Sequence, residues 1–224
     1  MLRPKMILID LDGTLIDSVP DLAYSVNAML ERLGRPTRSE AEVRTWVGNG
    51  VERLVGRALV GALDGEPPPA DLAQALPVFK AIYAENTSAR SQLYPGVREG
   101  LDFLRGAGYP LGCVTNKAAQ FTRPLLRDMG LLDSFGIVVS GDTLPEKKPH
   151  PAPLLHAAAH FGVAPAEALM IGDSVSDVKA ARAAGFRIIC TSYGYNHGQD
   201  IREANPDAVV DSLGELRNLV AARA

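Results

Sequence analysis

Two carboxylates follow an apolar segment near the start of the chain. The segment MILI (residues 6–9) has the composition of a buried strand, yet Asp10 comes directly after it and Asp12 lies two residues further on. Carboxylates avoid the apolar interior unless another group compensates their charge. Gly13 would let the chain turn so that backbone N–H groups face an anion. The two aspartates are therefore either capping groups of a turn or groups placed there for chemistry.

Polar groups also follow three later apolar segments. Thr115 and Asn116 end the second segment, Lys148 lies after the third, and Asp173 follows the fourth, with Asp177 four residues later. If the segments are parallel strands, these groups and the first two aspartates meet at one edge of the sheet. Four carboxylates so close cannot all stay ionised without a cation. Lys148 supplies one positive charge, and an all-oxygen donor set without histidine or cysteine suits Mg²⁺ for the rest.

These residue types suit the transfer of a phosphoryl group. Beside a divalent cation and a lysine, an ionised Asp10 is a competent nucleophile towards phosphorus and would form an aspartyl-phosphate. Asp12 could protonate the leaving oxygen and later deprotonate the attacking water. We expect the Thr115 hydroxyl, the Asn116 backbone N–H and Lys148 to hold the phosphoryl oxygens.

The apolar segments themselves predict the fold. Strands are expected at Met6–Ile9, Leu111–Thr115, Gly136–Ser140, Ala168–Ile171, Arg187–Thr191 and Ala208–Val210. Because these segments are apolar throughout rather than alternating, both faces of the sheet should be covered. Helical patterns lie between them, each followed by a glycine, at Val97–Gly106, Ala118–Met129, Pro153–Phe161 and Val175–Ala184. The alternation predicts an α/β fold with a doubly wound, Rossmann-like parallel sheet.

Residues 16–86 interrupt this alternation and are predicted to form a small all-helical cap domain. Helices are expected at Val19–Leu33, from a capping box at Ser39–Glu42, at Gly50–Val60 and at Ala70–Glu85. No strand is expected in this region. The catalytic core would then comprise residues 1–15 and 87–224.

The predicted cap contains a glycine-rich loop, Gly48-Asn49-Gly50, which could close over the site and choose the substrate. Trp46 and Val47, just before it, are expected to anchor the loop in the core of the cap. Arg53 and Arg57 follow the loop. They either meet a substrate carboxylate or, as we expect, form a solvated helix face.

The order of these motifs resembles that of the haloacid dehalogenase superfamily. DLDGT, the VTN stretch, the lysine of KKP and GDSVSD correspond to its four motifs, and the helical insertion matches its small cap, so that the resemblance spans the chain. It implies a hydrolase with Asp10 as the nucleophile and Asp12 as the general acid and base. It also implies phosphate binding by Thr115 and charge neutralisation by Lys148.

The same resemblance implies a set of Mg²⁺ ligands. They are Asp10, the backbone carbonyl of Asp12, and Asp173. Asp177 is either a further ligand or an acidic group that supports the others. A plainer alternative is that Ser174 caps the helix that follows and Asp177 favours its first turn.

Secondary motifs resemble those of bacterial phosphoglycolate phosphatases within the superfamily. They are WVGNG, LYPGV, KPHPAPL and SYGYNHG, and many of those proteins carry tyrosine where His197 stands here. The resemblance implies hydrolysis of 2-phosphoglycolate to glycolate and phosphate. Alternatives are a β-phosphoglucomutase, a pyrophosphatase, another small-phosphoester phosphatase, or a non-catalytic module that binds a phosphate ligand. A dehalogenase is disfavoured because that chemistry does not need the proton donor Asp12.

Composition narrows the partners and the location. The 224 residues are 46% hydrophobic and 22% charged with a net charge of −3, which is typical of soluble globular proteins and argues against a nucleic-acid surface. No apolar run approaches the roughly 20 residues of a membrane span, and no signal peptide is evident. We expect a cytoplasmic monomer or homodimer that acts on a small phosphorylated molecule. Cys113 and Cys190 are expected to be buried thiols.

Overall fold

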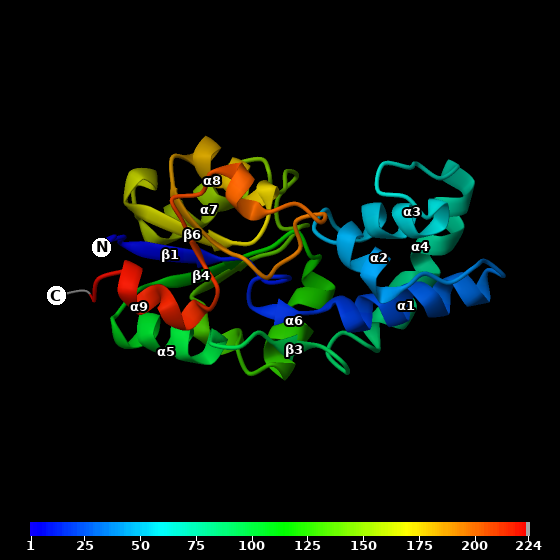
Figure 1. Cartoon of the computed structure of the whole chain (residues 1–224), viewed down its shortest axis with the longest axis horizontal. Coiled ribbons are helices and arrows are strands. Elements are labelled where there is room, and N and C mark those ends of the chain that lie inside the picture. Colours follow the sequence, from blue (N-terminus) through cyan, green and yellow to red (C-terminus); the bar gives the residue numbers. More distant parts are fainter. Residues whose placement is uncertain (223–224) are drawn as a thin grey trace.

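The computed structural model describes residues 1–222, and its centre is a six-stranded sheet (Figure 1). The strands are β1 (Met6–Ile9), β4 (Leu111–Val114), β5 (Ile137–Val139), β6 (Ala168–Gly172), β7 (Arg187–Thr191) and β8 (Ala208–Val210). All pairs are parallel, in the order β5-β4-β1-β6-β7-β8. The chain thus begins in the middle of the sheet and winds outwards in both directions, which confirms the predicted doubly wound α/β fold.

Helices cover both faces of this sheet (Figure 1). One face carries α5 (Val97–Gly106), α6 (Ala119–Asp128) and α9 (Leu216–Leu219), and the other carries α7 (Ala152–Phe161) and α8 (Val175–Ala184). Short 3₁₀ helices lie at Leu132–Ser134, Pro165–Glu167, Ile201–Ala204 and Leu213–Glu215. No described helix is long and apolar enough to span a membrane.

Strand β1 shows why the strand sequences are apolar throughout. Ile7 and Ile9 pack in the hydrophobic cluster under α5, α6 and α9, whereas Met6 and Leu8 pack in the cluster under α7 and α8. All four side chains are fully buried. Burial on both faces removes the alternation that a half-exposed strand would show. The predicted burial of the two free thiols is also confirmed, at Cys113 and Cys190.

Four helices pack together at the other end of the molecule from the chain termini (Figure 1). They are α1 (Val19–Arg32), α2 (Glu40–Trp46), α3 (Val51–Val60) and α4 (Pro69–Ala84). Their shared hydrophobic cluster includes the predicted loop anchors Trp46 and Val47. The predicted capping box is present, with Ser39 and Glu42 bonded to each other's backbone N–H. The division into a core of residues 1–15 and 87–224 and a cap of residues 16–86 stays a prediction.

The expectation that residues 16–86 contain no strand is wrong at its first two residues. Strand β2 (Ile16–Asp17) pairs antiparallel with β3 (Gln92–Leu93), so that the two segments leading to and from the four helices run side by side. Two residues are too few to show a strand period in the sequence. Their pairing depends on the return of the chain about 75 residues later, which local patterns do not reveal.

Candidate active site

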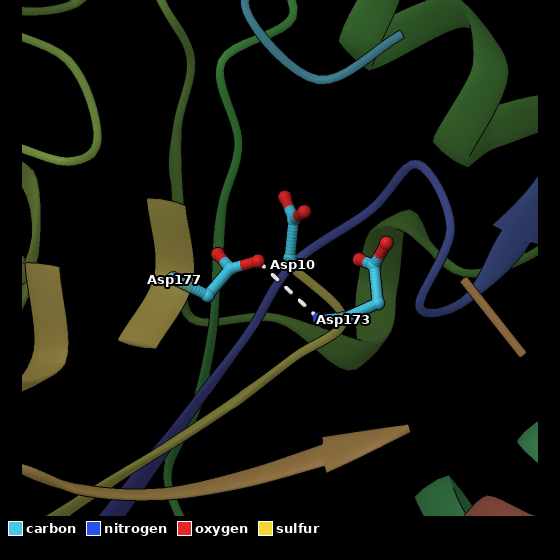
Figure 2. Close-up of side chains that lie close together, drawn as sticks. All are labelled: Asp10, Asp173 and Asp177. Carbon is cyan, nitrogen blue, oxygen red and sulfur yellow. Dashed lines mark hydrogen bonds between the residues drawn. The ribbon is translucent and has the colours of Figure 1, made fainter. Parts of the chain in front are cut away.

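Three aspartates converge at the carboxyl ends of two neighbouring strands. Asp10 follows β1, Asp173 follows β6, and Asp177 lies in the first turn of α8. Each carboxyl group offers an oxygen within 4.8 Å of the others, and all three residues are buried. Figure 2 shows the three side chains, with the hydrogen bond between the Asp173 N–H and Asp177 dashed. The structure therefore brings together three of the four carboxylates whose convergence the sequence predicts.

Crowding and burial make the charged state of this group costly. Burial raises the pKa of Asp10 to about 7; the charge of Lys148 offsets part of the effect and that of Asp177 adds to it. Burial also raises the pKa of Asp173 well above its ordinary value, with Asp10 and Asp177 adding to the effect. A divalent cation among the three would offset this cost. Apart from the Lys148 ammonium at 2.8 Å, Asp10 Oδ1 has no hydrogen-bond partner in the described part of the chain. The all-oxygen donor set therefore fits a hard cation such as Mg²⁺.

Of the three aspartates, Asp177 has the least hydrogen-bonding capacity left for a ligand. Its Oδ1 accepts from Lys148 Nζ at 2.7 Å, and its Oδ2 accepts from the hydroxyl and the N–H of Ser174 at 2.7 and 3.1 Å. Ser174 in turn accepts from the Asp177 N–H, which completes the predicted cap of α8. Both carboxylate oxygens are thus engaged with the protein. This environment favours a supporting role for Asp177 over direct contact with a metal.

Asp173 is held from two sides and keeps more capacity for a ligand. Its Oδ1 accepts from the Thr14 hydroxyl at 2.7 Å, and its Oδ2 accepts from the Tyr195 N–H at 2.6 Å. Each carboxylate oxygen can accept a second interaction. Asp173 therefore has a fixed orientation and free lone pairs, which is what a metal ligand requires.

Gly13 permits this close packing. Its φ is +88°, and a Cβ at this position would lie 2.3 Å from Asp173 Oδ2, so that only glycine fits. The expected turn is therefore present. Its own N–H donates to the Ile16 carbonyl at 3.0 Å, so Gly13 is not one of the residues whose N–H could face an anion.

Lys148 lies between two of the aspartates. Its Nζ is 2.8 Å from Asp10 Oδ1 and 2.7 Å from Asp177 Oδ1, and it donates to the Val114 carbonyl at 2.8 Å. The side chain is buried, and burial alone would lower its pKa. The charges of Asp10 and Asp177 outweigh that effect, so that the pKa of Lys148 is raised and the ammonium stays charged. Lys148 is thus a fixed positive charge beside the candidate nucleophile.

Asp12, the fourth predicted carboxylate, faces a different partner. It accepts from the Ser18 hydroxyl at 2.6 Å and from Lys117 Nζ at 2.9 and 3.0 Å. Lys117 is buried and was not among the sequence-predicted site residues. A signal for it exists, because Lys117 comes directly after Thr115 and Asn116 and so lies beyond the same strand end.

Thr115 and Asn116 lie on the same loop as Lys117. Thr115 Oγ1 accepts from the Lys117 N–H at 3.2 Å. The Asn116 side-chain amide donates to the Gly48 carbonyl at 3.0 Å and to the Lys148 carbonyl at 2.9 Å. Asn116 therefore links the loop after β4 to the loop that carries Lys148 and to the glycine-rich loop before α3. The sequence did not suggest this role.

The glycine-rich loop lies over the site only in part. Gly48 and Gly50 line the cavity, whereas the Asn49 side chain accepts from Arg57 at 2.9 Å on the other side of the loop. Arg57 also donates to the Trp46 carbonyl at 2.6 Å and is only 6% exposed. The expected solvated face is therefore wrong for Arg57, which holds the loop from inside. Arg53 does lie on the surface, where it pairs with Glu66.

The cavity between the strand ends and the four helices has a volume of about 50 Å³. Its polar side includes Asp10, Asp12 and Lys148, and its apolar side includes Leu22 and Leu54. One water molecule needs roughly 10–15 Å³ of such space. The cavity therefore suits a molecule of few heavy atoms, with a charged group at one end.

Comparison with known proteins identifies the family. The haloacid dehalogenase-like hydrolases match residues 4–185 of the chain. The protein belongs to this family. A phosphoglycolate phosphatase of Nitrosococcus oceani is 66% identical, over 98% of this chain and 97% of that protein. One of Thiobacillus denitrificans is 51% identical, over 96% and 95%. A crystal structure of a predicted phosphoglycolate phosphatase from Haemophilus somnus superposes with a TM-score of 0.92 at 38% identity, covering 98% and 99% of the two chains.

In this haloacid dehalogenase-like hydrolase, each aspartate of the first motif has its own lysine. Lys148 neutralises Asp10 on the side of the three-aspartate cluster. Lys117 neutralises Asp12 on the side of the four helices, since its Nζ lies 5.0 Å from the ring centroid of Tyr83 in α4. Two carboxylates only two residues apart thus have separate environments, each beside its own lysine.

Proposed function

We propose that this hydrolase cleaves 2-phosphoglycolate to glycolate and phosphate with Mg²⁺ as its cofactor. The observation that carries the proposal is the buried Asp10 at the end of β1, beside Lys148 and within reach of Asp173. The substrate rests on the phosphoglycolate phosphatases that match nearly the whole chain at up to 66% identity. The small cavity is consistent with so small a phosphoester.

In the first step, an oxygen of Asp10 attacks the phosphorus and forms an aspartyl-phosphate. The bond between phosphorus and the ester oxygen breaks, and Asp12 gives its proton to that oxygen as glycolate leaves. In the second step, water attacks the phosphorus and passes a proton to Asp12, and the acyl phosphate bond breaks to release phosphate. Both residues return to their starting states.

The remaining groups would hold the phosphoryl oxygens during both steps. We assign this role to the Thr115 hydroxyl, the Asn116 backbone N–H and Lys148. Bound Mg²⁺ would neutralise charge on the phosphoryl group. We propose Asp10, the Asp12 carbonyl and Asp173 as its ligands.

Asp177 would act by orienting other groups of the site. The glycine-rich loop, Gly48-Asn49-Gly50, would act by excluding water. Asp177 orients Lys148 and the start of α8 through the bonds described above. Gly48 and Gly50 would keep water from the site while Asn49 is held by Arg57. We propose that the protein acts in the cytoplasm, as a monomer or homodimer, without a nucleic-acid or membrane partner.

The test is phosphate release from a panel of small phosphoesters, with Mg²⁺ and with chelator. The panel comprises 2-phosphoglycolate, phospholactate, pyrophosphate, glucose 6-phosphate and β-glucose 1-phosphate. We expect a Mg²⁺-dependent kcat/KM for 2-phosphoglycolate far above the rest, and none with Asp10→Asn. A profile that peaks on another member would refute the substrate. No release from any member, or full activity in a folded Asp10→Asn variant, would refute the phosphatase itself.

A further inference from the structure

The cavity contains a cationic side chain that phosphoryl transfer does not account for. Among the described residues, Lys117 and Lys148 are the cationic groups that line it. Lys148 lies between Asp10 and Asp177, where the phosphoryl group is expected. Lys117 instead points towards the Asp12 carboxylate. Two of its three donors reach the oxygens of Asp12, at 3.0 and 2.9 Å, which leaves the third for Tyr83 or for a ligand beside it.

A buried hydroxyl without an acceptor for its proton lies beside this lysine. Tyr83 of α4 lines the cavity and is 1% exposed, and among the described residues its Oη has only the Lys117 ammonium beside it and no hydrogen-bond acceptor in reach. The ring packs between Phe79 and Phe121, with centroid distances of 5.5 and 4.9 Å. Native proteins rarely bury a polar group without a partner, because the lost hydration costs free energy. The hydroxyl is therefore positioned for a group that binds in the cavity.

Both groups suit an anion. Burial raises the pKa of Tyr83 to about 12, so the hydroxyl remains a neutral donor. The Asp12 carboxylate, 2.9 Å from Lys117 Nζ, favours the charged ammonium. An ammonium and a phenol hydroxyl side by side can each donate to one oxygen of a carboxylate.

We propose that Lys117 and Tyr83 form the subsite for the carboxylate of the substrate. The assignment rests on the proposed function and adds to it the residues that select the organic part. In 2-phosphoglycolate, one ester oxygen and one methylene carbon separate the carboxylate from the phosphorus. A phosphoryl group at Asp10 therefore places the carboxylate beyond Asp12, where Lys117 lies.

The subsite also joins two parts of the fold. Lys117 follows β4 of the sheet, whereas Tyr83 belongs to α4 among the four packed helices. A carboxylate that contacts both would stabilise their present arrangement around the cavity. A phosphoester without this carboxylate leaves the two donors buried and unpaired, and such unpaired groups are how a site rejects an analogue.

Other cations near the cavity have different surroundings. Arg57 donates to the Leu63 and Trp46 carbonyls and to Asn49, and Arg53 pairs with Glu66. Lys147 is exposed, and its Nζ lies 3.4 Å from where a Cβ on Gly50 would be, at the glycine-rich loop. Lys147 is thus a nearby lysine outside the proposed subsite, which makes it a matched control.

The test compares 2-phosphoglycolate with ethyl phosphate, in which a methyl group replaces the carboxylate. The measured quantity is the ratio of the two kcat/KM values in the intact protein with Mg²⁺. For Tyr83→Phe we expect the ratio to fall about ten- to 100-fold, the range for hydrogen bonds to charged groups, with no loss of thermal stability. For Lys117→Met we expect a fall of at least about 100-fold, partly restored by Lys117→Arg. Lys147→Met should leave the ratio unchanged.

Three outcomes would overturn the subsite while the phosphatase stands. They are a wild-type ratio near one, an unchanged ratio in folded Tyr83→Phe and Lys117→Met, and a collapse of the ratio in Lys147→Met. An equal loss on both substrates in Lys117→Met would mean that this lysine acts only through Asp12. No Mg²⁺-dependent release by the wild type from either compound would overturn the proposed function, and the subsite with it.

Discussion

Replacing Asp10, the proposed nucleophile, should stabilise the metal-free protein while it abolishes activity. Asp10 is buried with Asp173 and Asp177, and Lys148 offsets part of their charge. The Asp10→Asn variant removes one charge, and Lys148 keeps its contacts with Asp177 and the Val114 carbonyl. We therefore expect the variant to resist unfolding better than the wild type when Mg²⁺ is chelated.

The size of the effect follows from the pKa of Asp10. A carboxyl group whose pKa is raised on folding binds its proton more tightly in the folded state, so stability falls as pH rises from 3.8 to about 7. Over that interval the loss is about 4 kcal/mol if Asp10 acts alone. Because Asp10 interacts with charged neighbours that remain, we expect a gain of about 1–4 kcal/mol for Asp10→Asn at pH 8.

The assay is urea unfolding with chelator at pH 5 and pH 8. The advantage of Asp10→Asn should grow between the two pH values. Asp102→Asn, on the exposed face of α5, is the matched control for the change in net charge and should have little effect. With Mg²⁺ at about 100 times its Kd, the wild type should gain about 2.7 kcal/mol. Asp10→Asn should gain less, since it has lost a ligand. A variant no more stable than the wild type at pH 8 with chelator would refute the reasoning about crowded charge.

Two further substitutions test how the site is held in place. Gly13→Ala should raise the Mg²⁺ concentration needed for half-maximal activity about ten- to 100-fold, because its Cβ would lie 2.3 Å from Asp173 Oδ2; an unchanged Mg²⁺ titration would contradict this. Arg57→Leu should raise KM for the substrate more than it lowers kcat, because it releases the Trp46 carbonyl and Asn49 from the arginine. Steady-state kinetics with Arg53→Leu as the surface control would check this, and equal effects of the two variants would count against it.

The strand ends were predictable from the sequence because the sheet is buried on both faces. Each strand is apolar throughout, so the first polar residue after it marks the edge where ligands bind. This reasoning led to Asp10 and Asp173 without any structure, whereas Lys148 lies further along the loop after β5 and was included for its position after that strand. The order of helices and strands was also predictable, because the residues that end helices and form turns lie within a few positions of the element they bound. Gly162 and Gly185, for example, end their helices in the left-handed conformation.

Contacts between distant segments were not predictable in the same way. Lys117 is two residues beyond a strand end, but only the structure shows that it pairs with Asp12 rather than with solvent. Arg57 has the sequence context of a solvated helix face, yet the loop between α3 and α4 covers it and supplies the Leu63 carbonyl. An arginine is buried only when such carbonyl acceptors reach it, and the sequence does not fix where they lie.

The two lysines explain how aspartates two residues apart can act differently. Asp10 faces the carboxylate cluster through Lys148, where we propose that the phosphoryl group binds. Asp12 faces Ser18 and Lys117 at the helical side of the cavity, where we propose that the leaving oxygen lies. A carboxylate bound at Lys117 would therefore lie next to Asp12, which we propose donates the proton to the leaving oxygen of the same molecule. Recognition of the substrate's carboxylate and acid catalysis by Asp12 would then both depend on Lys117. A fall in rate alone would not distinguish these two roles, whereas the ratio of kcat/KM for 2-phosphoglycolate to that for ethyl phosphate would.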